Sequence, residues 1–193
     1  MKQREVDARA VSTRAAFAIA PPPEVGWLGL VDSARACIEH YGLKPIPEEG
    51  GWFRRVLEST LKEDGRQAAW TSILALFTRD GFSALHRLSI DEVWVYHEGD
   101  ALEMLLLRPV GDGAGDVATI RLGLNAETGE RPRVAVPAGT WQGARPVGDR
   151  GWGLVSCLCV PGFLPECFEL GRRDVLMEMY QESRNAIAEF TRG

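Results

Sequence analysis

Hydrophobic residues change their spacing twice along the chain, and these changes predict the order of the secondary-structure elements. From Leu28 to Tyr41 the apolar positions recur at helical intervals, and Gly42 follows as a C-terminal cap would. From Trp52 onward they occur in short runs rich in β-branched and aromatic residues, separated by Gly, Pro and Asp. The pattern predicts one helix followed by an all-β region.

The β region divides into a series of predicted strands. They cover residues 52–58, 71–78, 83–88, 92–98, 101–109, 117–122, 133–136 and 153–160. Helical spacing returns from Asp174 to Phe190 and predicts a C-terminal helix within residues 173–193. The predicted fold is therefore mainly β, with an N-terminal and a C-terminal helix.

The start of the chain has a different composition from the rest. Residues 1–26 are rich in Ala and charged side chains and contain Pro21, Pro22 and Pro23, which predicts a partly flexible extension ending in a stiff linker. In a chain of 193 residues this leaves room for one domain of ordinary size. We place that domain at residues 27–172.

Composition and charge argue against several classes of partner. The formal net charge of -5, without a basic stripe, predicts no nucleic-acid partner. No apolar segment approaches the roughly 20 residues that span a bilayer, so no membrane partner is expected. The four cysteines lack the paired spacing of a zinc or redox motif, and Cys157 and Cys159 would share one strand face as small buried side chains. We predict a cytoplasmic location.

The densest cluster of chemically active side chains lies between Gly81 and Gly99. It places His86 and Glu92 on adjoining short strands. The segment resembles the first cupin motif, a Gly, a His-x-His pair, a Glu and a final Gly, in which Glu92 and Gly99 keep the expected spacing. The second cupin motif, Pro-x-Gly-x-x-His, is similar to residues 137–142 here.

More narrowly, the chain resembles the cupin family named domain of unknown function 985. Similar segments occur in the same order at residues 47–52, 86–94, 98–100, 136–142, 161–163 and 168–170. The similarity extends over about residues 28–172. It implies a cupin jelly-roll β-barrel that is usually a homodimer, and it implies no settled reaction.

Departures from the general cupin pattern bear on metal binding. Leu88 stands where the pattern has its second His, and Gln142 stands where it has its last. Imidazole is the side chain that suits Fe, Ni, Cu and Zn, so the remaining donors should bind these metals weakly. We expect no cofactor. If a divalent metal does bind, its ligands would be His86, Glu92 and Gln142.

The same residues can move protons without a metal. A carboxylate beside an imidazole fixes its tautomer and raises its basicity, so we assign His86 as the base and Glu92 as its orienting group. Alternation along the strand brings Trp94 and Tyr96 to the face of Glu92, and Tyr96 is the candidate acid. Sugar epimerases of the cupin fold offer only a fold-level analogy. Alternatively, these groups simply satisfy one another's hydrogen bonds inside the barrel.

Other residues are candidates for substrate binding. Glu49 precedes Gly50 and Gly51, which permit positive φ or close approach to a ligand. Arg54 could clamp an anionic group. The aromatic walls would come from Trp94 and Trp141, and Gln142 would donate its amide to a developing oxyanion.

Together these features predict a cupin that binds a small polar organic molecule. Its reaction would be an isomerisation, epimerisation or elimination by metal-independent acid and base steps. Two alternatives remain open: a non-catalytic metabolite-binding cupin, and a metal-dependent oxygenase or decarboxylase.

Overall fold

The computed structural model describes residues 33–59, 67–111 and 113–192. The predicted extension, residues 1–26, lies outside this part of the chain. The strands are β1 (Lys44–Pro45), β2 (Trp52–Glu58), β3 (Thr71–Thr78), β4 (Ser83–Leu88), β5 (Asp91–Gly99), β6 (Leu102–Val110), β7 (Gly113–Leu122), β8 (Arg133–Val136), β9 (Trp141–Pro146), β10 (Trp152–Val160) and β11 (Phe168–Leu170). The helices are α1 (Ala34–Tyr41), α2 (Arg173–Met179) and α3 (Arg184–Glu189), with 3-10 turns η1 (Ala126–Thr128), η2 (Pro165–Cys167) and η3 (Gln181–Ser183).

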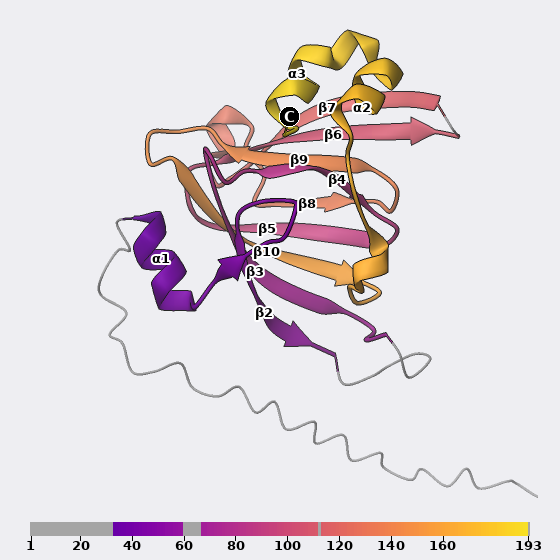
Figure 1. Cartoon of the computed structure of the whole chain (residues 1–193). Helices are drawn as coiled ribbons and strands as arrows, with labels where there is room; N and C mark the ends of the chain where they lie inside the picture. Colours follow the sequence, from indigo (N-terminus) through magenta and orange to yellow (C-terminus); the bar gives the residue numbers. More distant parts are fainter. Residues whose placement is uncertain (1–32, 60–66, 112, 193) are drawn as a thin grey trace, which may run out of the picture. The chain divides into compact units, whose positions relative to one another are not determined.

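The strands form two antiparallel sheets. One is six-stranded, in the order β1-β2-β3-β10-β5-β8, and the other is five-stranded, in the order β11-β4-β9-β6-β7. Consecutive strands in the sequence therefore often belong to different sheets, as in a jelly roll (Figure 1). The predicted mainly β architecture with helices at both ends is confirmed.

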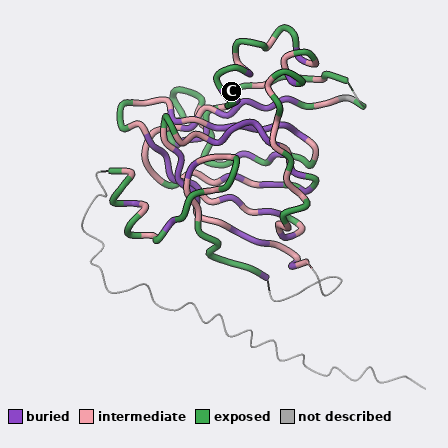
Figure 2. The backbone as a smooth tube through the Cα atoms, viewed as in Figure 1, coloured by how far each residue is buried: buried purple, intermediate pink, exposed green. Residues whose placement is uncertain are grey.

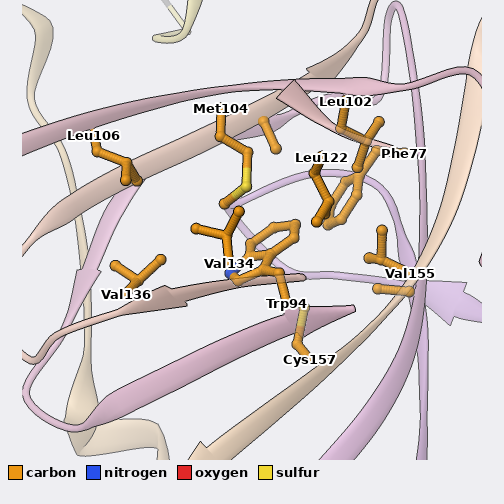
Figure 3. Close-up of a cluster of buried hydrophobic side chains, with 12 residues drawn as sticks. Phe77, Trp94, Leu102, Met104, Leu106, Leu122, Val134, Val136, Val155 and Cys157 are labelled. Atoms are coloured by element: carbon orange, nitrogen blue, oxygen red, sulfur yellow. The ribbon is translucent and has the colours of Figure 1, made fainter. Parts of the chain in front are cut away.

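The main core lies between the two sheets. It contains Phe77 and Trp94 from the six-stranded sheet and Leu102, Met104 and Leu106 from the five-stranded one, all at most 1% exposed (Figure 3). Their side chains point toward one another across the gap between the sheets. Burial of this apolar surface is the principal source of stability for such a barrel.

Strand β6 is buried on both faces. Leu102, Met104 and Leu106 face the core between the sheets, whereas Leu105 and Leu107 belong to a second buried cluster. Successive side chains of a strand point to opposite faces, so the unbroken apolar run at residues 104–107 needs cover on both sides. Helices α2 and α3 provide the outer cover (Figure 1).

The C-terminal segment is helical, as predicted, but it is not one continuous helix. Tyr180 ends α2 with φ -112° and ψ 66°, and η3 then leads into α3. Leu176, Tyr180, Ile187 and Phe190 are buried on the sheet while most of the helix surface stays exposed (Figure 2). The break lets both short helices place apolar residues on the sheet.

The N-terminal helix has the predicted C-terminal cap. Gly42 adopts φ 61° and ψ 41°, and its N–H donates to carbonyl groups of the last turn. Ser33 caps the other end by accepting from the Ala36 amide at 3.2 Å. Residues 28–32 of the predicted helix lie outside the described part of the chain. None of the helices described is long and apolar enough to cross a membrane.

The sequence pattern missed strand β9. Its residues include Gly143 and Pro146, which are uncommon in strands. A Cβ at Gly143 would lie 3.1 Å from the Phe190 ring and 3.1 Å from the Ser83 carbonyl oxygen. Glycine is favoured there because α3 and the neighbouring strand β4 approach the backbone closely. The short strands β1 and β11 were also missed.

Candidate functional site

A cavity of about 620 Å³ opens between strands of the two sheets. Its lining is mostly apolar and comes from β2, β3, β4, β5, β10 and the start of β11, together with the segments at residues 46–49 and 163–165. The described lining residues are Ile46, Pro47, Glu48, Glu49, Phe53, Arg55, Thr71, Ile73, His86, Leu88, Glu92, Cys157, Cys159, Phe163, Pro165 and Phe168. A cavity of this size and character is typical of small-molecule sites.

His86 is held in one orientation by the backbone. Its side chain is 3% exposed, and Nδ1 lies 2.9 Å from the carbonyl oxygen of Ala84. The carbonyl can only accept, so Nδ1 carries a hydrogen. The ring stacks on Phe168 with a centroid separation of 5.3 Å. No described residue is hydrogen-bonded to Nε2, which leaves this nitrogen available to a ligand.

Glu92 belongs to a buried network with Trp94 and Gln142. Its Oε2 accepts from Trp94 Nε1 at 3.0 Å and from Gln142 Nε2 at 2.7 Å. Trp94 Nε1 also lies 2.9 Å from Gln142 Oε1. The other carboxyl oxygen, Oε1, is contacted by the Cys159 thiol at 3.6 Å. The network fixes the carboxyl group and occupies one of its oxygens.

Burial raises the pKa of Glu92 above its ordinary value of 4.5. The neighbouring His86 lowers the pKa, Glu49 raises it, and the hydrogen bonds from Gln142 and Trp94 lower it, but burial dominates. Both N–H donors contact Oε2, and the Cys159 thiol contacts Oε1. Glu92 is therefore suited to donate a proton.

Glu49 extends the site from a neighbouring loop. Its Oε1 accepts from the Ser83 hydroxyl at 2.7 Å and lies 3.9 Å from Nδ1 of His86. Its side chain is only 12% exposed. The carbonyl of Glu49 accepts from the Ala84 amide at 3.1 Å, which ties the loop to β4. A carboxylate in this place stabilises positive charge on the imidazole.

The C-terminus holds the same loop from outside. Arg192 Nη2 donates to the carbonyl oxygens of Glu49 at 3.1 Å and Phe82 at 2.6 Å, and its guanidinium lies 4.6 Å from the centre of the Phe82 ring. Gly50, at φ 99°, passes so close that a Cβ there would collide with Arg192. Arg192 thus positions the loop that carries Glu49.

Replacing Arg192 with Ala is expected to loosen the Glu49 loop without unfolding the barrel. The loss of two hydrogen bonds from a charged donor should cost about 1 kcal/mol, reduced by the exposure of the side chain. Hydrogen exchange followed by mass spectrometry should show faster exchange of the Glu49 and Ala84 amides. Arg172→Ala is the matched control, because Arg172 forms an exposed ion pair with nearby Asp174. Unchanged exchange in Arg192→Ala would contradict the positioning role.

The structure brings together three of the candidate residues, His86, Glu92 and Glu49, at the cavity, and places Trp94 and Gln142 directly beside Glu92. Trp141, also predicted to contact substrate, lies elsewhere. It packs in the cluster beneath α2 and α3, with the Arg87 guanidinium 4.6 Å above its ring.

Two further predicted residues lie apart from the cavity lining. Tyr96 packs against the main core, and its hydroxyl donates to the Gly99 carbonyl at 2.7 Å. Tyr96 is not among the described residues that line the cavity. Arg54 is exposed on β2, whereas the next residue, Arg55, lines the cavity. Alternation along β2 puts Phe53 and Arg55 on one face and Arg54 on the other.

The main residues missed by sequence reasoning are aromatic. Phe53, Phe163 and Phe168 line the cavity, and only Phe53 could have been found from strand alternation. Phe163 lies in an irregular segment and Phe168 begins a short strand that was not predicted. The positions of Phe163 and Phe168 depend on how the chain folds after β10.

The donor set does not fit a transition-metal site. The described residues contain no group of three or more His, Cys, Asp or Glu side chains placed to hold a metal ion. His86 supplies a single imidazole, and Oε2 of Glu92 is already occupied by Trp94 and Gln142. The amide of Gln142 is likewise used within the network, so it cannot serve as a free third ligand.

Comparison with known proteins agrees with the fold. A structure from Shewanella oneidensis is 32% identical, covers 83% of this chain and 98% of that chain, and has a TM-score of 0.77. A hypothetical protein from Leishmania major is 31% identical, covers 83% of this chain and 99% of that chain, and has a TM-score of 0.76. An oxalate decarboxylase from Bacillus subtilis is only 12% identical and has a TM-score of 0.47. The match covers 78% of this chain and 37% of that chain. A search of curated proteins found no significant match.

The antiparallel double-sheet barrel with a cavity between its sheets defines a protein of the cupin class. The family model for DUF985, a family of the cupin superfamily, matches residues 35–171, which is most of the described chain. The chain belongs to this family.

Proposed function

We propose that the cavity binds a small organic molecule and transfers protons on it, as an isomerase, epimerase or lyase does. One observation carries this proposal: His86 and Glu92, 3% and 6% exposed, line the same cavity, and no described residue is hydrogen-bonded to Nε2 of His86. A base and an acid with environments that favour different protonation states are the usual parts of such a site.

In the proposed reaction, His86 Nε2 removes a proton from a carbon of the substrate. The imidazolium that forms is stabilised by Glu49, whose Oε1 lies 3.9 Å from Nδ1. Glu92 donates its carboxyl proton to the oxygen on which negative charge develops. Transfer of a proton back to carbon gives isomerisation or epimerisation, and departure of a neighbouring group gives elimination.

The proposed roles differ from the sequence-based hypothesis in three respects. We propose Glu92 as the acid in place of Tyr96, because the Tyr96 hydroxyl donates to Gly99. Gln142 donates to Glu92 at 2.7 Å, so we propose that it positions the acid and does not contact an oxyanion. We propose that the Ala84 carbonyl, in place of Glu92, orients the His86 ring through its contact with Nδ1.

Deuterium incorporation tests this proposal. The protein would be incubated in D₂O with a panel of aldoses, ketoses, 2-oxo acids and amino acids, and exchange at carbon followed by NMR. His86→Ala is expected to reduce exchange of any active compound by about 10²-fold or more. The control His40→Ala changes an exposed histidine of α1 and should leave the rate unaltered. Equal rates in His86→Ala and wild type would contradict the role of the base.

A non-catalytic metabolite-binding cupin is the second candidate. It is supported by the network of Glu92, Trp94 and Gln142, which satisfies buried polar groups without any ligand. Saturable binding of panel members without deuterium exchange would favour this candidate. Metal-dependent oxygenase or decarboxylase chemistry is not proposed, because the donor set does not fit a metal.

We also propose a homodimer in the cytoplasm. Val56 and Leu57 of β2 are 37% and 45% exposed, and they are apolar side chains that a second copy could cover. The four cysteines are free, as expected in a reducing compartment. Light scattering coupled to size exclusion measures the subunit number directly.

A further inference from the structure

We propose that the ligand of the cavity is an organic cation, an amine whose ammonium group lies beside Glu49 and whose apolar body lies against phenylalanine rings. This inference rests on the proposed function and deepens it by naming the chemical class of the ligand. Three features of the cavity support it: its carboxylates, its aromatic lining and the free nitrogen of His86.

The charges on the lining favour a cation. Among the described lining residues, Glu48, Glu49 and Glu92 carry carboxyl groups and Arg55 carries a guanidinium group. Arg55 is turned toward protein partners: its Nη1 lies 3.5 Å from Glu58 and its Nη2 lies 3.4 Å from the Phe163 carbonyl. Its side chain is 42% exposed, whereas that of Glu49 is 12% exposed. The buried charge that a ligand meets is therefore negative.

Glu49 lies 3.9 Å from Nδ1 of His86 through Oε1, but its other carboxyl oxygen, Oε2, has no described hydrogen-bond donor. Its Oε1 accepts one hydrogen bond, from Ser83. A ligand that closes the cavity removes water from this carboxylate, which is costly unless the ligand supplies a hydrogen-bond donor or a positive charge. An ammonium group supplies both, a hydroxyl supplies only the donor, and a carboxylate adds repulsion.

The aromatic lining favours the same class of ligand. Phe53, Phe163 and Phe168 all line the cavity, and the faces of aromatic rings attract cations. One face of Phe168 is covered by the His86 ring, so Phe53 and Phe163 are the rings proposed to contact the cation. They also provide apolar contact area for the rest of the molecule. Phenylalanine rings together with a carboxylate are a combination that recognises amines.

His86 completes the binding groups. The side chain is 3% exposed, lines the cavity and has no described partner at Nε2. With its hydrogen on Nδ1, the ring accepts a hydrogen bond at Nε2. An N–H group of an amine is a suitable donor, and a carboxylate is not.

The decisive experiment compares benzylamine, benzyl alcohol and benzoate, which share one ring and differ in charge. Binding to the full-length protein would be measured by isothermal titration calorimetry at neutral pH. We expect benzylamine to bind about tenfold more tightly than benzyl alcohol, and benzoate to bind most weakly. Benzoate binding as tightly as benzylamine, or no preference among the three, would overturn the proposal.

Variants identify where the preference arises. Glu49→Gln keeps an acceptor for Ser83 and should reduce benzylamine binding about tenfold while leaving benzyl alcohol nearly unchanged. Phe163→Leu should also weaken the amine more than the alcohol, which provides a second test if Glu49→Gln folds poorly. Glu127→Gln, on the exposed η1, is a control with the same change in net charge. A preference that persists in both cavity variants would contradict the assignment.

Failure of this inference can be told apart from failure of the proposed reaction. Amine preference without deuterium exchange in any amine would support the ligand class and reject catalysis. Deuterium exchange of an anionic compound, lost in His86→Ala, would reject the ligand class and leave the acid–base chemistry intact.

Discussion

Replacing Trp94 with Ala is expected to lower the free energy of unfolding by about 3–5 kcal/mol, as for other fully buried aromatic residues. Trp94 is 1% exposed and stacks on Phe77 with a centroid separation of 5.6 Å in the middle of the core (Figure 3). Its removal leaves a cavity and takes one donor from Glu92 and Gln142. Urea unfolding followed by circular dichroism measures the change.

Two variants separate packing from hydrogen bonding at this position. Trp94→Phe keeps most of the packing but removes the indole N–H, and should cost about 1–3 kcal/mol. Trp70→Ala is the matched control, since Trp70 is only half-buried and should cost less than Trp94→Ala. A loss below about 1 kcal/mol in Trp94→Ala would show that the core does not depend on this residue.

Regular alternation explains what the sequence predicted well. The observed bounds of β2, β3, β4 and β8 are those expected from the pattern, because apolar and β-branched runs between turn residues define such strands. The same alternation correctly placed Trp94 on the face of Glu92, since a side chain two positions along a strand returns to the same side. Both results need only local information.

The errors in the site come from a strand that the pattern did not reveal. Trp141 and Gln142 are consecutive residues of β9, so they point to opposite faces of the sheet. Gln142 reaches Glu92, whereas Trp141 packs beneath the C-terminal helices. Without the strand, neither side chain could be given a face, and both were assigned to the substrate.

Long-range contacts account for the remaining differences. The partners of Glu49 are Ser83 and the amide of Ala84 on β4, and the loop is held from outside by Arg192. These contacts join segments that are far apart in the sequence, so periodicity carries no information about them. Tyr96 shows the same limit, because a backbone carbonyl satisfies its hydroxyl.

Replacing Glu92 with Gln is expected to raise the free energy of unfolding above that of the wild type, by an amount that grows as pH rises. Burial raises the pKa of Glu92 above 4.5, so the folded state keeps a proton that the unfolded state releases. This contribution to stability is fully present below the unfolded pKa and is lost as pH rises through the folded pKa. Each unit by which the folded-state pKa exceeds the unfolded pKa corresponds to about 1.4 kcal/mol of unfolding free energy. The amide introduced by Glu92→Gln would resemble the neutral acid and lack this pH-dependent loss.

Urea unfolding at a series of pH values from acidic to alkaline tests the sign. The difference between Glu92→Gln and wild type should be smallest at acidic pH, grow as pH rises above about 4.5, and level off above the folded pKa. Glu127→Gln, an exposed control, should follow wild type throughout. Parallel curves for Glu92→Gln and wild type would mean that Glu92 ionises normally. The same variant should abolish deuterium exchange, because Gln cannot donate an acidic proton, so a gain in stability together with a loss of turnover would identify Glu92 as a buried functional acid.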